Sequence, residues 1–158
     1  MKIRKATLDD LKEIDLIYVE GCIDEVRIQH PEKSKESIKN VMKKAEKERL
    51  RFSRKNLKNP LNLLLVAEIN NKIVGFTEAS VKKVDQKLEG FWEKAYIKKE
   101  FRRRGVGKSL GKEIFKWLKK KKAKSVEAGL FIKNKRSRAL CRFFGLKLVA
   151  IKMFKELK

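Results

Sequence analysis

AYIKKEFRRRGVGKSL, residues Ala95–Leu110, joins an apolar segment, three arginines, two glycines and the start of a segment with helical spacing. Glycine lets the backbone pass close to a ligand because it carries no Cβ atom. The first amides of a helix have no acceptor within it, and with the helix dipole they bind anions such as pyrophosphate. The stretch predicts a strand, an anion-binding turn at Gly105 and Gly107, and a helix. The spacing matches neither a Walker loop nor a dinucleotide fingerprint, and a tight turn without a ligand is the alternative.

Hydrophobic spacing on either side of this stretch predicts alternating strands and helices. The expected strands are Met1–Lys5, Leu63–Ile69, Lys72–Lys82, Gly90–Ile97, Val126–Ile132 and Leu146–Leu157. The expected helices run from a cap at Thr7 to about Cys22, from Ser34 or Ser37 to before Pro60, from Lys108 to Lys119–Lys122, and over about Arg136–Phe144. This order predicts an α/β (α+β) fold of three layers, αβα, in which a mixed central sheet lies between two layers of helices.

The size and composition of the chain fit a single domain. It has 158 residues, of which 42% are hydrophobic, so we expect residues 1–158 to build one core. The sequence has no run of 18 apolar residues and no signal-peptide pattern, which predicts a soluble, cytoplasmic protein without a membrane span. Cys22 and Cys141 are far apart and His30 is the one histidine, so we expect neither a disulfide framework nor a metal site.

The formal net charge is +23, and it is concentrated toward the C-terminus. Residues 1–50 carry 12 basic and 11 acidic side chains, residues 51–100 carry 11 and 6, and residues 101–158 carry 20 and 3. This basic C-terminal third would attract nucleic acid, an acidic protein, an anionic membrane surface or a polyphosphate cofactor. The alternative is a thermophile-like lysine coat, although such surfaces usually pair Lys with Glu.

Several motifs together resemble the GNAT superfamily of acyl-CoA-dependent N-acyltransferases. Residues 95–110 look like the family's strand, its Arg/Gln-x-x-Gly-x-Gly/Ala turn and the opening of its main helix. Asn134 stands a short strand beyond that helix, where the family usually has Asn, and Gly145-Leu146 follows eleven residues on. The opening IRKATLDDLKEI resembles the family's first strand and helix. The resemblance covers nearly the whole chain and implies the acyl-CoA N-acyltransferase fold, with a splayed central sheet.

The resemblance also implies acetyl-CoA as cosubstrate. Its pyrophosphate would lie on the turn, and its pantetheine arm would pair with a strand backbone like an added strand. A backbone amide of that strand would polarise the thioester carbonyl. The residues implied in binding are Ala95, Tyr96, Ile97, Arg102, Arg103, Arg104, Gly105, Val106, Gly107, Lys108 and Asn134.

At the proton-transfer groups the sequence departs from the family pattern. Many members have a Tyr seven residues after the Asn as proton donor to the leaving thiolate, but Cys141 stands there, and it equally suits a core position. Some members have a Glu five residues before the Asn, where this chain has Gly129. Glu93, expected on the face of Ala95 and Ile97, and Glu127 are therefore the candidate bases, ahead of Glu78 and a water chain.

We therefore expect an enzyme that transfers an acetyl group to a primary amine by direct attack in a ternary complex. The acceptor is a protein N-terminus, a lysine or a small-molecule amine. The alternative is a basic nucleic-acid-associated binding module on the same scaffold without catalysis. MFKEL (Met153–Leu157) resembles the family's closing strand but follows Gly145 almost at once. The acceptor site is thus expected to be open or completed by a second subunit through strand pairing, as in a homodimer.

Overall fold

The computed structural model describes residues 1–151 and 155. Five strands form one sheet in the order β1-β2-β3-β4-β5, antiparallel except for the last pair. The strands are β1 (Lys2–Lys5), β2 (Asn62–Ile69), β3 (Lys72–Val84), β4 (Lys87–Ile97) and β5 (Val126–Glu127). The helices are α1 (Leu11–Gln29), α2 (Lys35–Lys44), α3 (Glu46–Lys58), the short 3-10 helix η1 (Lys99–Phe101), α4 (Val106–Lys120) and α5 (Lys135–Phe143).

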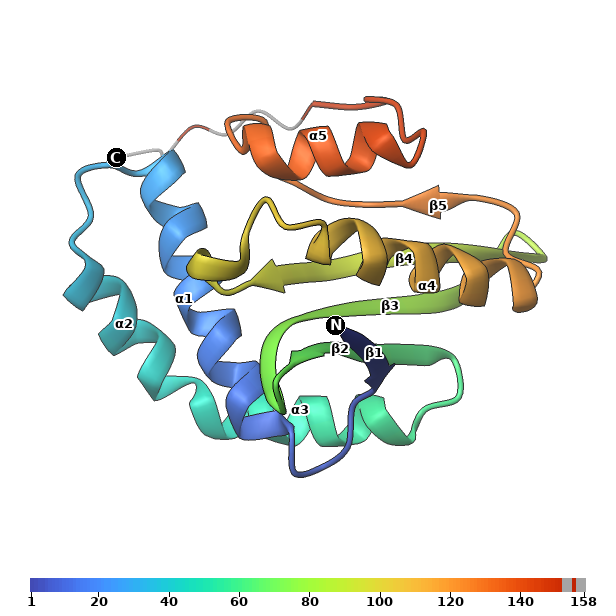
Figure 1. Ribbon diagram of the computed structural model, residues 1–158. Coiled ribbons are helices and arrows are strands. Elements are labelled where there is room, and N and C mark those ends of the chain that lie inside the picture. Colours follow the sequence, from blue (N-terminus) through green and yellow to red (C-terminus); the bar gives the residue numbers. More distant parts are fainter. Residues whose placement is uncertain (152–154, 156–158) are drawn as a thin grey trace.

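Helices cover both faces of the sheet (Figure 1). On one face, the apolar side of α4 packs on the inward residues of β2, β3 and β4, with Leu110 and Ile114 fully buried. On the other face, Leu11, Ile14 and Ile17 of α1 pack against β2 and β3, and α3 covers the same core. Burial of these two apolar layers stabilises the sheet between them. The expected mixed three-layer fold is confirmed.

The sheet splays open at its last strand pair. β5 pairs with β4 at Gly90 and Phe91, and β4 then continues to Ile97 with no partner strand on that side among residues 1–151 and 155. Figure 1 shows β5 and α5 diverging from the end of β4. The free edge of β4 therefore borders the space between α1, α4 and α5.

Aromatic packing holds α5 in place across this opening. Phe144, which follows α5, stacks on Phe115 of α4 with ring centroids 4.8 Å apart, and its ring also meets Trp92 of β4 edge-on at 5.5 Å. Gly111 makes room for this ring, because a Cβ there would lie 2.5 Å from Phe144 Cε2. The helix that carries the predicted Asn134 is thereby fixed against α4 and β4.

Several predicted element bounds are wrong. α1 continues to Gln29 rather than ending near Cys22, and the expected second helix is broken at Ala45 into α2 and α3. α1 begins after Asp10, whose carboxylate accepts from the Thr7 amide at 2.7 Å, so Thr7 precedes the helix cap.

The C-terminal strands differ most from expectation. β5 ends at Glu127 instead of Ile132, because the chain leaves the sheet there. Residues 146–151 have no regular secondary structure, so the expected last strand is wrong there, and the rest of it, including nearly all of MFKEL, lies outside the described residues.

Candidate active site

A cavity of about 490 Å³ lies between α1, the free edge of β4, the turn before α4, and α5. Ten of the eleven cofactor residues predicted from the sequence line it: Ala95, Tyr96, Ile97, Arg102, Arg103, Gly105, Val106, Gly107, Lys108 and Asn134. Arg104 is the exception, because its guanidinium lies 5.5 Å above the ring of Phe101. The structure thus gathers residues from three separate sequence segments around one space.

The turn before α4 presents backbone amides as the sequence predicts. Gly105 adopts a left-handed conformation with φ of 79°, and Arg103 has φ of 65°. Ser109 donates the first helical hydrogen bond, to the Gly105 carbonyl at 3.0 Å. Among the described residues, the backbone amides of positions 103–108 have no hydrogen-bond acceptor. These free amides at a helix N-terminus fit a pyrophosphate group.

Gly107 keeps the turn close to β4. A Cβ atom at this position would lie 3.3 Å from Ile97 Cδ1 and 3.4 Å from Leu140 Cδ2. A larger side chain would therefore have to push into the cavity or displace both neighbours. The glycine allows the amides and the free strand edge to border the same space.

Arg102 ties the strand end to α1. Its Nε donates to the Ile97 carbonyl at 2.9 Å, and its Nη1 donates to Asp24 Oδ2 at 2.6 Å. The guanidinium therefore has two protein partners already. Its position supports the cavity wall, and the neighbouring Arg103 and Lys108 are exposed.

Asn134 is buried at 6% exposure and is the N-terminal cap of α5. Its Oδ1 accepts from the Ser137 amide at 3.1 Å, and its Nδ2 donates to Glu25 Oε1 at 3.1 Å. The side chain thus joins the start of α5 to α1. Its side-chain amide lies at the cavity wall.

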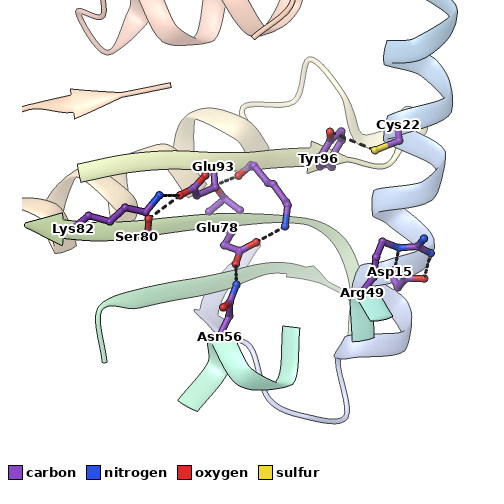
Figure 2. A network of polar contacts seen from close by, with 11 residues as sticks. Asp15, Cys22, Arg49, Asn56, Glu78, Ser80, Lys82, Glu93 and Tyr96 are labelled. Carbon is purple, nitrogen blue, oxygen red and sulfur yellow. Dashed lines mark hydrogen bonds and ion pairs between the residues drawn. The ribbon is translucent and has the colours of Figure 1, made fainter. Parts of the chain in front are cut away.

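The phenol of Tyr96 also reaches α1. It donates to Glu25 Oε2 at 2.7 Å and lies 3.7 Å from the Cys22 sulfur, a contact visible in Figure 2. Burial raises the pKa of the Tyr96 phenol well above its ordinary value, and the nearby Cys22 and Glu25 add to the shift. The phenol is therefore a neutral hydrogen-bond donor.

One wall of this cavity, formed by α1, was not predicted from the sequence. Gly21, Asp24, Glu25 and Ile28 line it from one helix face. Their spacing of three, four and seven residues was the available signal. This spacing could not be used at the sequence level, because the predicted helix ended near Cys22 and left three of the four residues outside it. In the structure, α1 extends to Gln29 and carries all four.

Comparison with known proteins identifies the family to which this site belongs. Residues 27–146 match the sequence profile of the Acetyltransferase (GNAT) family. The chain belongs to the GNAT acetyltransferase family. It is therefore an acetyl-CoA-dependent N-acetyltransferase, as the resemblance implied. No curated protein matches the chain.

Solved structures of acetyltransferases share the fold over the full chain. An aminoglycoside 6'-N-acetyltransferase from Acinetobacter haemolyticus is 20% identical, with 100% of this chain and 99% of that chain covered and a TM-score of 0.74. A predicted acetyltransferase from Clostridium acetobutylicum, solved with acetyl-CoA, is 18% identical over 99% and 95% of the chains, with a TM-score of 0.74. An aminoglycoside acetyltransferase from an uncultured soil metagenomic sample, in complex with sisomicin, is 19% identical over 99% and 96%, with a TM-score of 0.65.

Glu93 of this acetyltransferase does not share a strand face with Ala95 and Ile97, contrary to expectation. β4 has a bulge here: Glu78 pairs with Lys94 and Ala79 with Trp92, so Glu93 is the extra residue. Its carboxylate accepts from Ser80 Oγ at 2.7 Å and from Lys82 Nζ at 3.4 Å (Figure 2).

The bulge turns Glu93 toward the α1 and α3 side of the sheet. Its partner Ser80 lies between Ala79 and Val81, and both of these pack in the core under α4. Ser80 therefore faces the opposite side, and Glu93 follows it there. Glu93 does not line the 490 Å³ cavity.

The other proton-transfer candidates are also outside the cavity wall. Glu127 is exposed at the end of β5, opposite Phe91. Cys141 is half-buried on α5, where burial raises the pKa of its thiol, while Leu140 next to it lines the cavity. Glu78 is 7% exposed and accepts from Asn56 and Lys94, each at 2.7 Å. The catalytic roles of Glu93, Glu127 and Cys141 stay predictions.

No helix in the described part of the chain is long and apolar enough to cross a membrane. Within residues 1–151 and 155, no three His, Cys, Asp or Glu side chains lie together as a metal site would require.

Proposed function

We propose that this enzyme transfers the acetyl group of acetyl-CoA directly to a primary amine while both substrates are bound. The observation that carries the proposal is one cavity bordered both by free helix N-terminal amides and by a free strand edge. The amides at 103–108 fit the pyrophosphate, and Arg103 and Lys108 add charge there. The edge at Ala95–Ile97 fits the amide-bearing pantetheine arm.

In this mechanism, the protein orients the reacting groups and stabilises charge. When bound, acetyl-CoA supplies the thioester whose acetyl group is transferred. A β4 amide facing the cavity stabilises the negative charge that develops on the thioester oxygen. Asn134 holds the pantetheine arm further along. Because α4 and α5 are packed together through Phe115 and Phe144, these donors are fixed before substrate arrives.

The reaction also requires two proton transfers, one from the amine and one to the leaving thiolate. A lysine-like amine has a pKa near 10.4, so a base must remove its proton before attack at neutral pH. Glu93 and Glu127 are the proposed bases, acting through water because neither borders the cavity. The neutral thiol of Cys141 is the proposed donor to the leaving thiolate.

The experiment combines an acceptor screen with initial-rate kinetics. Free CoA is measured with a protein N-terminal peptide, a lysine peptide, spermidine and sisomicin as acceptors. Intersecting double-reciprocal lines support a ternary complex, whereas parallel lines indicate a covalent acetyl-enzyme. Glu93→Gln, Glu127→Gln and Cys141→Ala then test the proton-transfer groups one at a time, and an unchanged rate removes that residue from the mechanism.

The basic surface supports a second candidate function, binding of RNA through the C-terminal third. Lys112, Lys116 and Lys120 follow one another at four-residue spacing along the exposed side of α4. A non-catalytic module would bind RNA with a strong salt dependence and would be indifferent to acetyl-CoA. Stabilisation by acetyl-CoA together with turnover of an amine excludes that reading as the sole function.

We also propose a cytoplasmic location and a homodimer. A dimer would complete the acceptor side by strand pairing, as expected from the short segment between Gly145 and MFKEL. Sedimentation velocity at several protein concentrations tests it, and a monomer at every concentration removes the dimer from the proposal.

A further inference from the structure

The two carboxylates on the α1 wall of the cavity have different partners. Asp24 forms an ion pair with Arg102, with 2.6 Å between Oδ2 and Nη1. Glu25 accepts from two neutral donors, the Tyr96 phenol at 2.7 Å and the Asn134 amide at 3.1 Å. Among the described residues, no cation lies within ion-pair distance of Glu25. Its negative charge is therefore compensated by hydrogen bonds alone.

This arrangement is unusual in a chain with a net charge of +23. The other acids on α1 that face the protein are paired, Glu13 with Lys98 and Asp15 with Arg49. The cations of the cavity that lack an ion pair among the described residues are Arg103, Lys108 and Arg136, and the phosphates of CoA are anionic partners for such groups. Acetyl-CoA carries no cationic group that would pair with an acid on the α1 wall.

The carboxylate of Glu25 has room for another donor. An ionised carboxylate offers about four lone-pair positions, and two are occupied by Tyr96 and Asn134. A primary ammonium group carries three N–H donors and a full positive charge. It would complete both the hydrogen bonding and the charge balance of this group.

We propose that Glu25 binds the ammonium group of the acceptor, which makes the acceptor a cationic amine. The inference rests on the proposed function, because it places the second substrate in the same cavity. Glu25 is bonded to Tyr96, and the backbone of Tyr96 belongs to the strand that orients the thioester. An amine held by Glu25 therefore lies beside that strand. Tyr96 and Asn134 are positioning residues, since they fix the direction of the carboxylate.

A purely structural role for Glu25 makes different predictions. Glu25 links α1 to β4 and to the start of α5, so its loss would then lower the free energy of unfolding without changing ligand recognition. Glu25→Gln keeps an oxygen for the Tyr96 phenol and removes the charge. Glu25→Asp keeps the charge on a shorter arm. Glu20→Gln is the matched control, because Glu20 is exposed on the same helix and does not line the cavity.

The binding test uses n-butylammonium, which has the four-carbon stem and terminal charge of a lysine side chain. Isotope-labelled protein is titrated with it, with and without CoA, and the side-chain NH₂ signal of Asn134 is followed because that group donates to Glu25. We expect saturable shifts in wild type and Glu20→Gln, partial retention in Glu25→Asp, and loss in Glu25→Gln. n-Butanol, which has no charge, should not change the chemical shift of the Asn134 side-chain NH₂ signal. Equal shifts in wild type and Glu25→Gln, or no shift in wild type, would overturn the proposal.

Kinetics with the best acceptor of the screen gives an independent readout. Removing a hydrogen bond to a charged group costs enough to raise the KM for the amine about tenfold or more in Glu25→Gln. The KM for acetyl-CoA should change less than about twofold. A loss of kcat with both KM values unchanged would contradict the role in ammonium binding. Failure of wild type to bind acetyl-CoA would instead reject the proposed function, while the butylammonium titration still reports on Glu25.

Discussion

The ion pairs among the described residues lie almost entirely in the N-terminal part of the molecule. Residues up to Arg102 form nine of the ten, among them Arg4 with Asp10 at 2.7 Å and Lys94 with Glu78 at 2.7 Å. From Arg103 onward, the one ion pair among the described residues is Lys116 with Glu113 at 4.0 Å. The ion pairs of the first part therefore contribute to the fold, whereas most basic side chains of the second part are available to ligands.

The largest effect is expected in the ligand-binding part, where one substitution should abolish cofactor binding without unfolding the protein. Gly107→Trp places a large side chain where a Cβ already approaches Ile97 and Leu140. We expect acetyl-CoA to give no thermal stabilisation of this variant and kcat/KM to fall at least about 100-fold, because the pyrophosphate amides are covered.

A matched control separates blockage from misfolding. Lys112→Trp introduces the same side chain on the exposed side of α4 and should keep the stabilisation by acetyl-CoA. Circular dichroism checks that Gly107→Trp is folded. If folded Gly107→Trp is stabilised as much as wild type, the cofactor does not lie on this turn.

In the N-terminal part, the largest stability effect is expected at Glu78, a buried carboxylate that bonds the partly exposed Lys94 and Asn56. Glu78→Ala leaves Lys94 and Asn56 without their carboxylate partner and should lower the free energy of unfolding by about 3 kcal/mol. Urea denaturation measures this value. A double-mutant cycle with Lys94→Ala should show coupling of about 1 kcal/mol or more. Additive losses would mean that the pair contributes little beyond its separate contacts.

The pair of Arg4 and Asp10 predicts loss of stability in acid. The Arg4 guanidinium, which bonds both carboxylate oxygens, lowers the pKa of Asp10 to about 2. Since the unfolded value is near 3.9, the ionised carboxylate stabilises the fold above about pH 4, and this contribution of about 2 kcal/mol disappears as the pH falls toward 2. Asp10→Asn should remove that part of the pH dependence.

The adjacent residue supplies the control for this titration. Asp9 is exposed, so Asp9→Asn should leave the unfolding free energy and its pH dependence close to wild type. Both variants are compared by urea denaturation between pH 2.5 and 7. Parallel pH curves for wild type and Asp10→Asn would show that the Arg4 contact contributes no net stability.

Local sequence signals predicted the turn that borders the cavity, because its free amides depend on backbone conformation near glycine. Gly105 and Gly107 specify a turn whose amides are free whatever the distant packing. Asn134 was predicted from the resemblance to the GNAT family. Hydrophobic periodicity predicted the order of strands and helices as far as α5, except for the break at Ala45 between α2 and α3.

The acceptor side could not be predicted in the same way. One extra residue in β4 reverses the face on which Glu93 points, and no local pattern marks that bulge. Glu25 reaches the cavity because α1 extends to Gln29 and packs beside Tyr96. These positions depend on contacts between segments about 70 and 110 residues apart along the sequence, so they emerged from the structure.

The smallest effect on stability, and the sharpest test of the exposed basic charges, is expected on α4. Lys112, Lys116 and Lys120 are exposed and repeat every four residues, about 6 Å apart along the helix. Changing all three to Gln should alter the free energy of unfolding by less than about 0.5 kcal/mol each. If this row binds RNA, the slope of log affinity against log salt should become shallower by about 2 for a single-stranded oligonucleotide.

The control triple has the same spacing on a different helix. Lys35, Lys39 and Lys43 are exposed on α2, in the part of the chain where basic and acidic residues are nearly balanced. Changing these three to Gln removes the same net charge and should leave the salt slope almost unchanged if binding is local to α4. Equal losses from both triples would show that RNA responds to total charge alone. The excess charge would then act as a general electrostatic field, and the C-terminal third would hold no RNA site of its own.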